Sequence, residues 1–117
     1  MKALGQHLVI ELYGCDKKAL SRVDTVQAIM IEAAKAANAT VIDSIFHHFA
    51  PYGVSGVVVI AESHFAIHTW PEHKYASVDL FTCGDKIIPW EAFKVLKKRF
   101  KSSHFSAMKM ERGLLPG

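Results

Sequence analysis

Hydrophobic and polar positions divide the first third of the chain into a strand and a helix. Residues 8–13 alternate apolar and polar closely enough to predict a β-strand with one buried face. Residues 23–37 then carry apolar side chains at spacings of three and four, which predicts a helix with a narrow, alanine-rich face. Asp24 can cap or charge the start of this helix, and Asn38 suits its end. Such a face can lie close on a sheet.

The middle of the chain is rich in β-branched and aromatic residues, which favour strands. Residues 40–49 and 54–61 flank the turn Pro51-Tyr52-Gly53 and therefore predict a hairpin-like pair. Residues 65–70 form a shorter extended segment, and residues 76–82 alternate again. Several strands therefore follow the first helix.

The last third predicts a second helix and a final strand. Pro89 can open the helix, and residues 106–110 can supply the strand. The apolar face of the helix consists of Trp90, Phe93, Leu96 and Phe100. This order of elements predicts an α+β fold, a two-layer α/β sandwich of a mainly antiparallel sheet with two helices on one face. The other face of the sheet needs cover, and we expect dimerisation through it.

Composition narrows the class of protein. The 117 residues are 50% hydrophobic and about the size of one domain, so we expect a single domain over residues 1–117. The longest apolar run, residues 57–61, is far shorter than the roughly 20 residues that span a membrane. The first residues lack the apolar region of a signal peptide, and Cys15 and Cys83 are too few for a disulfide framework. These features predict a cytoplasmic protein with no membrane partner.

Two further function classes are disfavoured. The net charge is +3, but the lysines of the second helix alternate with its apolar face as solvated residues do, so we expect no nucleic-acid partner. The 7 histidines invite a metal site, yet the adjacent His47 and His48 would point to opposite faces of a strand. No pair of candidate ligands repeats at metal-site spacing, so we expect no metal.

Candidate chemistry concentrates in residues 62–72 and 79–85, which bring a hydroxyl, imidazoles, carboxylates and a thiol close to strand ends. By residue type alone, Ser63 near His68 could be a nucleophile with its base. Cys83 could be a proton donor or a second nucleophile. Ordinary strand and turn residues fit the same pattern, so residue types leave the chemistry open.

Several blocks of sequence, taken in order and with their spacing, match one known family. They are Leu4-Gly5-Gln6-His7-Leu8, Pro51-Tyr52-Gly53-Val54-Ser55-Gly56-Val57-Val58-Val59-Ile60, Glu62-Ser63-His64, Ile67-His68-Thr69-Trp70-Pro71-Glu72 and Asp79-Leu80-Phe81-Thr82-Cys83-Gly84. The chain resembles the prokaryotic S-adenosylmethionine decarboxylases over nearly its whole length, with a weaker match after the second helix.

The resemblance implies a proenzyme that cuts itself between Glu62 and Ser63 into a 1–62 chain and a 63–117 chain. In this family the serine hydroxyl attacks the preceding carbonyl, and the resulting ester eliminates to leave dehydroalanine at position 63. The dehydroalanine then tautomerises and loses ammonia, which leaves a pyruvoyl group. That group forms a Schiff base with the substrate and takes up the electrons left by CO₂, as pyridoxal phosphate does elsewhere. The resemblance implies neither a metal nor pyridoxal phosphate.

Roles for further residues follow from the same resemblance. His68 is the implied proton acceptor in processing, since a neutral imidazole can take a proton at working pH, and Ser55 supports this step. Cys83 is the implied proton donor in decarboxylation, because a protonated thiol can act as an acid. Phe49 would stack on adenine, and Glu72 would accept hydrogen bonds from the ribose hydroxyls.

The implied reaction is the decarboxylation of S-adenosylmethionine to the aminopropyl donor of spermidine biosynthesis. Family members are homodimers of proenzymes, (αβ)₂ after cleavage, with the site at the interface, so residues of two protomers can meet. Two alternatives stay open: a non-catalytic relative that binds or regulates a partner, and a pyruvoyl enzyme for another amino acid. An intact Glu62-Ser63 bond would favour the first, and loss of inhibition by adenosine compounds would favour the second.

Overall fold

Six strands and three α-helices make up most of the chain in the computed structural model, which describes residues 2–116. Within these residues no helix has the length and hydrophobicity needed to span a membrane. The elements are, in chain order, β1 (Lys2–Tyr13), α1 (Lys17–Ser21), α2 (Val23–Ala36), β2 (Val41–His48), β3 (Val54–Ile60), β4 (Ser63–Trp70), the 3₁₀ helix η1 (Pro71–His73), β5 (Tyr75–Cys83), α3 (Pro89–Arg99) and β6 (His104–Leu115).

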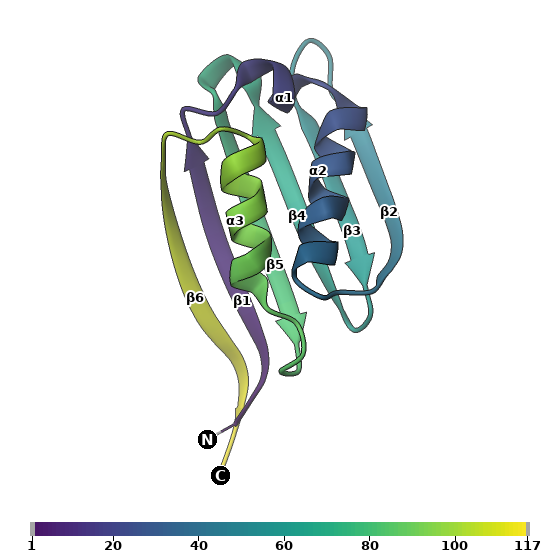
Figure 1. Ribbon diagram of the computed structural model, residues 1–117, viewed down its shortest axis with the longest axis vertical. Helices are drawn as coiled ribbons and strands as arrows, with labels where there is room; N and C mark the ends of the chain where they lie inside the picture. The colour runs from purple at the N-terminus through teal and green to yellow at the C-terminus, as the bar shows by residue number, and fades with distance from the viewer. Residues whose placement is uncertain (1, 117) are drawn as a thin grey trace.

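The strands form one sheet in the order β2-β3-β4-β5-β1-β6. Every neighbouring pair is antiparallel. The helices lie on one face of this sheet, where α2 and α3 run side by side (Figure 1). The predicted two-layer α+β sandwich is confirmed, and the short α1 adds a third helix to the two that were expected.

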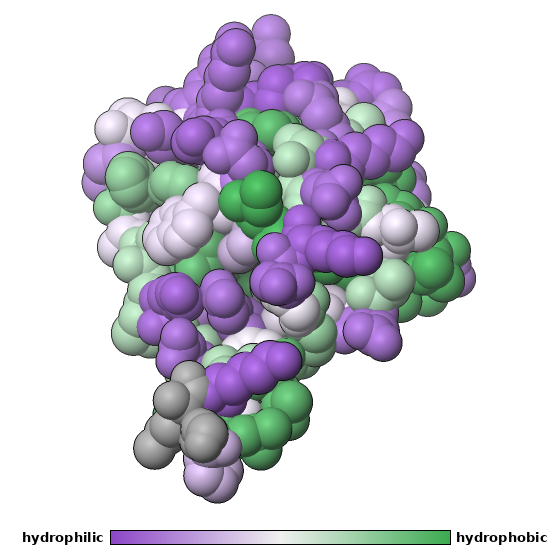
Figure 2. All heavy atoms as spheres, turned by 60° about the horizontal axis from the view of Figure 1, so that its bottom comes forward, coloured by the Kyte–Doolittle hydropathy of each residue, from purple (hydrophilic) through white to green (hydrophobic). Residues whose placement is uncertain are grey.

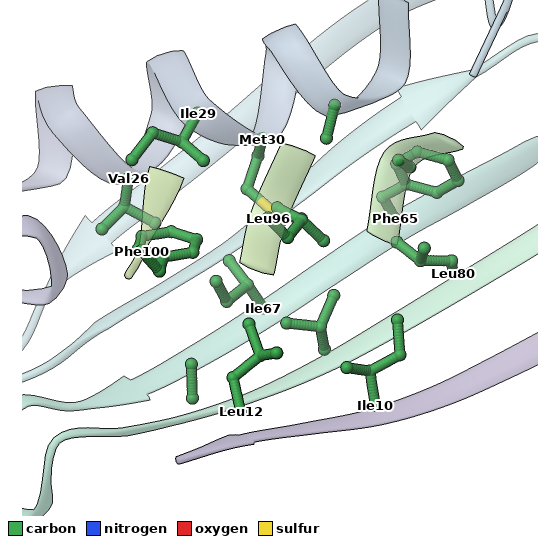
Figure 3. Packing of buried hydrophobic residues seen from close by; sticks show 14 of the residues in the cluster. Ile10, Leu12, Val26, Ile29, Met30, Phe65, Ile67, Leu80, Leu96 and Phe100 are labelled. Carbon is green, nitrogen blue, oxygen red and sulfur yellow. The ribbon is translucent and has the colours of Figure 1, made fainter. Parts of the chain in front are cut away.

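The core lies between the sheet and the two longer helices (Figure 3). Alternate side chains of β4 and β5 are fully buried, among them Phe65, Ile67 and Leu80, because successive residues of a strand point to opposite faces. Met30 of α2 and Leu96 of α3 belong to the same buried cluster. Each such side chain stabilises the fold by roughly 1.5–3 kcal/mol relative to leaving it exposed.

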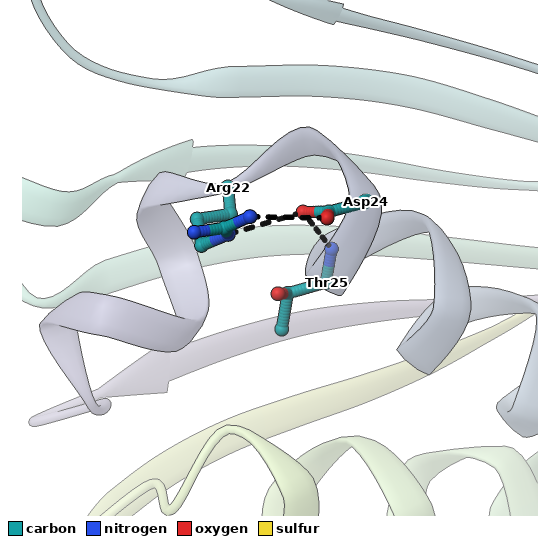
Figure 4. Close-up of polar contacts among 3 residues, drawn as sticks. All are labelled: Arg22, Asp24 and Thr25. Atoms are coloured by element: carbon teal, nitrogen blue, oxygen red, sulfur yellow. Dashed lines mark hydrogen bonds and ion pairs between the residues drawn. The ribbon is translucent and has the colours of Figure 1, made fainter.

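The residues predicted to begin and end helix α2 can be compared with those found at its two ends. Arg22 occupies the N-cap position, and no side chain among residues 2–116 caps this end. Asp24 lies inside the first turn, where its carboxylate accepts hydrogen bonds from the Arg22 guanidinium at 3.2 Å and the Thr25 backbone N–H at 2.9 Å (Figure 4). The Arg22 bond is the main cause that lowers the pKa of Asp24. Asp24 therefore charges the helix start, and Asn38 follows the helix with a φ of 66°.

Strands β1 and β6 are longer than the sequence pattern predicts. β1 begins at Lys2 rather than residue 8, and β6 spans His104–Leu115 rather than 106–110. The two strands pair along their length and project beyond the rest of the sheet as a two-stranded ribbon (Figure 1). Every side chain of β6 is exposed, so no buried face imposes an alternating pattern on it.

The sheet face turned away from the helices is exposed and is called the open face from this point. Alternation along the strands places Val57 and Val59 of β3 on it, with Ile45 of β2 beside Val57. These apolar side chains are 38%, 40% and 73% exposed, respectively. The open face therefore carries hydrophobic surface as well as the polar residues described below.

We expect Leu96→Ala to lower the free energy of unfolding by about 2–5 kcal/mol, because it leaves a cavity between α3 and the sheet. Leu114→Ala is the matched control: this leucine is 52% exposed on the ribbon, so its loss should cost no more than about 0.5 kcal/mol. Urea unfolding at one protein concentration measures both. A larger loss for Leu114→Ala would contradict the assigned core.

Candidate active site

The predicted site residues fall into two groups at opposite ends of the sheet. Glu62, Ser63 and Cys83 lie where β3 turns into β4 and where β5 ends, at the bottom of Figure 1. Ser55 and His68 lie near the start of β3 and the end of β4, toward the top of that view. Figure 2 shows the bottom end brought forward, with the terminal ribbon projecting and hydrophobic and hydrophilic side chains mixed across it.

The β3–β4 turn holds its backbone in an uncommon conformation. Glu62 has a φ of 67°, in the left-handed region that costs a non-glycine residue roughly 1 kcal/mol. Ser63 follows it and pairs with Ile60 across the hairpin. The hydroxyl of Ser63 is buried and has no hydrogen-bond partner among residues 2–116. Strain and an unpaired buried hydroxyl therefore meet at the bond between these two residues.

Cys83 shares a hollow with this turn. The hollow has a volume of about 340 Å³. It is lined by Asn38, Thr40, Ala61, Glu62, Cys83, Gly84, Asp85, Lys86 and Ile87. Cys83 is partly exposed, whereas Cys15 is buried. The thiol is thus accessible beside the carbonyl side of the Glu62-Ser63 bond.

The second group is held by a cross-strand hydrogen bond. Ser55 of β3 and His68 of β4 are direct partners, and the Ser55 Oγ lies 2.8 Å from the His68 Nδ1. They line a second hollow of about 230 Å³. Its walls are Phe49, Tyr52, Gly53, Val54, Ser55, His68, Thr69, Trp70 and Glu72. This hollow therefore brings together two residues with implied roles in processing, Ser55 and His68, and the two implied substrate contacts, Phe49 and Glu72.

Ser63 and His68 of one chain do not meet, so the generic pairing of a nucleophile with its nearby base is wrong. They are five residues apart on one strand, which is roughly 16 Å at about 3.3 Å per residue. Alternation also places them on opposite faces, because Ser63 shares its face with the buried Phe65 and His68 lies on the open face. Proximity in sequence was misleading because an extended strand separates its residues.

A buried threonine positions the second group. The Thr69 hydroxyl donates to the Leu20 carbonyl oxygen at 2.8 Å and accepts from the Val54 backbone N–H at 2.9 Å. The residue is only 5% exposed. It therefore ties the end of α1 and the start of β3 to β4, between His68 and Trp70. No role for Thr69 was predicted from the sequence, since a single hydroxyl among apolar residues does not reveal which backbone groups it will contact.

Aromatic residues continue the open face beside this hollow. Trp70 stacks on Tyr75 with 5.2 Å between ring centroids, and Tyr75 stacks on Tyr13 at 5.4 Å. The Tyr75 hydroxyl donates to the Glu11 carboxylate at 2.6 Å. Desolvation, followed by this carboxylate, raises the pKa of Tyr75, so its hydroxyl stays a donor. Among residues 2–116 no group of three or more His, Cys, Asp or Glu side chains is placed to hold a metal ion.

Comparisons with known proteins show what this chain is similar to. The sequence profile described as S-adenosylmethionine decarboxylase matches residues 6–113. The chain is 53% identical to the S-adenosylmethionine decarboxylase proenzyme of Pelotomaculum thermopropionicum, over 99% of this chain and 92% of that protein. It is 55% identical to the proenzyme of the same name from Fervidobacterium nodosum, over 97% of this chain and 82% of that protein.

A solved structure shares the fold. The crystal structure of the adenosylmethionine decarboxylase from Aquifex aeolicus superposes with a TM-score of 0.91 at 37% identity. The match covers 99% of this chain and 96% of that one. The likeness in fold therefore includes β6, which follows α3 and lies where the resemblance in sequence is weaker.

Replacing Thr69 with valine should destabilise the fold by about 2–5 kcal/mol, since it leaves the Val54 N–H and the Leu20 carbonyl buried without their partner. Thr69→Ser keeps the hydroxyl and should cost about 1 kcal/mol or less. Urea unfolding of both variants tests this. Equal losses would show that the methyl group, rather than the hydroxyl, matters.

The two cysteines should differ sharply toward iodoacetamide in the native protein. Burial raises the pKa of Cys15 to about 11. About 0.1% of such a thiol is ionised at pH 8, and the thiolate is the reactive form. We expect alkylation of Cys83 first, with Cys15 modified only on unfolding, as read by peptide mass spectrometry. Modification of both at equal rates in the native protein would contradict the burial of Cys15.

Proposed function

The chain belongs to the S-adenosylmethionine decarboxylase family, a family of enzymes, and we propose that it decarboxylates S-adenosylmethionine after cutting itself between Glu62 and Ser63. The product would be the aminopropyl donor for spermidine, and the cytoplasmic location stays a prediction. The observation that carries the proposal is the strained Glu62 beside a buried, unpaired Ser63 hydroxyl, with Cys83 on the same hollow.

Residue 63 fits the origin of a pyruvoyl group. A serine hydroxyl held in the interior without a partner among residues 2–116 loses about 1–3 kcal/mol of hydrogen bonding, so a purely structural role would favour alanine there. The group would supply an electrophilic carbonyl and an electron sink for the departing CO₂. It would be held at the start of β4, beside the hollow that Cys83 lines.

Ser63 is chemically suited to the cut. Its oxygen can reach the Glu62 carbonyl through a five-membered ring, so the acyl group moves from nitrogen to oxygen and the backbone nitrogen receives a proton. Removal of the α-proton of residue 63 then breaks the Cβ–Oγ bond, which releases the 1–62 chain with a new C-terminal carboxylate and leaves dehydroalanine. An imidazole such as that of His68 of a second protomer can accept this proton. The imine tautomer of dehydroalanine takes up water and loses ammonia, which gives the pyruvoyl group. The positive φ of Glu62 raises the free energy of the intact turn, and cleavage releases that strain.

Substrate recognition is proposed for the second hollow. Phe49 is 51% exposed and offers a ring face to an adenine base, and its ring lies edge-on to His47 at 4.5 Å. The exposed carboxylate of Glu72 can accept hydrogen bonds from ribose hydroxyls. Trp70, also on this hollow, offers an aromatic face to a sulfonium cation.

A second copy of the chain would bring the two groups together. Cys83 and His68 both lie on the open face but at opposite ends, too far apart for one small substrate. A two-fold axis lying across the strands would place the bottom end of one open face against the top end of its partner. The exposed Ile45, Val57 and Val59 supply apolar surface for this contact. We therefore propose a homodimer, (αβ)₂ after cleavage, with two shared sites.

Intact mass under denaturing conditions tests self-cleavage. We expect two chains that meet between Glu62 and Ser63, the second with a blocked start, and one uncut chain for Ser63→Ala. Ser106→Ala, which removes an exposed hydroxyl on β6, should cut as the unsubstituted chain does. An uncut unsubstituted chain after long incubation would favour a binding or regulatory role over catalysis.

Co-expression of Cys83→Ala with His68→Ala tests whether sites are shared. Each homodimer would lack one essential group at both sites, whereas a mixed dimer would combine an intact Cys83 and an intact His68 at one site. Random pairing then restores about a quarter of the unsubstituted activity, because half of the dimers are mixed and each has one of two sites. No recovery in a confirmed mixed dimer would place each site within one protomer.

A further inference from the structure

An arginine lies in the same row of the sheet as Cys83. Arg112 of β6 pairs with Gly5 of β1, and Gly5 pairs on its other side with Cys83 of β5. Residues in one row across a sheet share a face, and the residue between the other two has no side chain. Gly5 therefore leaves the surface between Arg112 and Cys83 open to the side chains of the flanking strands.

Phe81 shows how that surface is used. Its ring reaches over Gly5, with a ring carbon 2.8 Å from the place that a Cβ at Gly5 would take. The guanidinium carbon of Arg112 lies 5.8 Å from the centroid of the same ring. Arg112 thus leans from β6 toward β5 and rests on an aromatic face. A guanidinium held in this way keeps the N–H groups at its edge available to an anion.

Arg112 differs in its partners from the other arginines of the chain. Arg22 pairs with Asp24 at 3.2 Å, and Arg99 pairs with Glu32. In the part of the chain that the structure describes, no carboxylate forms an ion pair with Arg112. The side chain is therefore positioned by Phe81 and has its charge available at the end of the sheet that carries Ser63 and Cys83.

We propose that Arg112 binds the carboxylate of the substrate beside Cys83, an inference that rests on the proposed function. The carbon that receives a proton from Cys83 is the carbon that carried this carboxylate. The carboxylate must therefore lie close to the thiol before CO₂ leaves. A guanidinium can hold it through two parallel hydrogen bonds, which fix its plane as well as its position. By holding the carboxylate in this way, Arg112 would determine the direction in which CO₂ departs.

Lys86 is the rival cation, since it lines the hollow that contains Cys83. Two carboxylates, those of Glu62 and Asp85, line the same hollow and would compete for it. Its ammonium is a compact charge that cannot fix the plane of a carboxylate as a guanidinium fork does. The geometry therefore favours Arg112, and a variant of each residue separates the two.

The test is the binding of two adenosine thioethers that carry no amine and so cannot react. Their 5′ chains end in a carboxylate in one compound and in a methyl group in the other. Calorimetry on the purified processed protein should show that Arg112→Gln weakens binding of the carboxylate compound roughly ten- to hundredfold and leaves the affinity for the methyl compound unchanged. Arg112→Lys, which keeps the positive charge, should lose less affinity for the carboxylate compound than Arg112→Gln does. Lys109→Gln, which removes a positive charge from the same strand, should change neither affinity.

Several outcomes would overturn the inference. Equal weakening of both compounds by Arg112→Gln would mean that Arg112 only supports the local structure. If Lys86→Gln selectively weakened binding of the carboxylate compound and Arg112→Gln did not, the carboxylate would be assigned to Lys86. Failure of both compounds to bind the unsubstituted protein would count against the proposed function itself, whereas normal binding that Arg112→Gln leaves unaltered would overturn the role of Arg112 alone.

Discussion

The antiparallel register of β3, β4 and β5 is the constraint on which the candidate site depends. It makes Ser55 and His68 direct partners and places Cys83 at the same end of the sheet as the β3–β4 turn. A shift of one residue would exchange the two faces of a strand, burying His68 and exposing Phe65. The buried apolar face therefore enforces the register, and the register in turn positions the polar residues. Stability and site geometry have the same origin.

Covering one sheet face with helices has a consequence for the other. Helices α2 and α3 bury the apolar side chains of their face, while the open face carries Ser55, His68 and Cys83 together with exposed valines and Ile45. Polar groups at the two ends and apolar surface between them suit a contact with a second sheet. A lone protomer would hold the two groups too far apart to act on one substrate, so assembly and catalysis would be coupled.

The sequence predicted those parts of the fold in which one face is buried. Alternation in β5 and helical spacing in α2 gave the right elements, and Asn38 ended α2 as expected. The spacing of apolar residues did not predict elements correctly where no face is buried, as in β6, or where the element is short, as in α1. The motifs supplied the residues of the candidate site, but their grouping needed the structure, because only the length and pleat of β4 separate Ser63 from His68.

Ser63 and Glu62 carry two locally unfavourable features on adjacent residues. The Ser63 hydroxyl is buried without a hydrogen-bond partner among residues 2–116, whereas the buried Thr69 hydroxyl is paired, and Glu62 holds a φ of 67° in the β3–β4 turn. Two unfavourable features on adjacent residues are hard to retain for stability alone, since alanine at 63 would remove one of them without loss of packing. Natural sequences depart from such consistency mainly at functional sites. The proposed self-cleavage would give this cost a function, because breaking the bond between these two residues would release it.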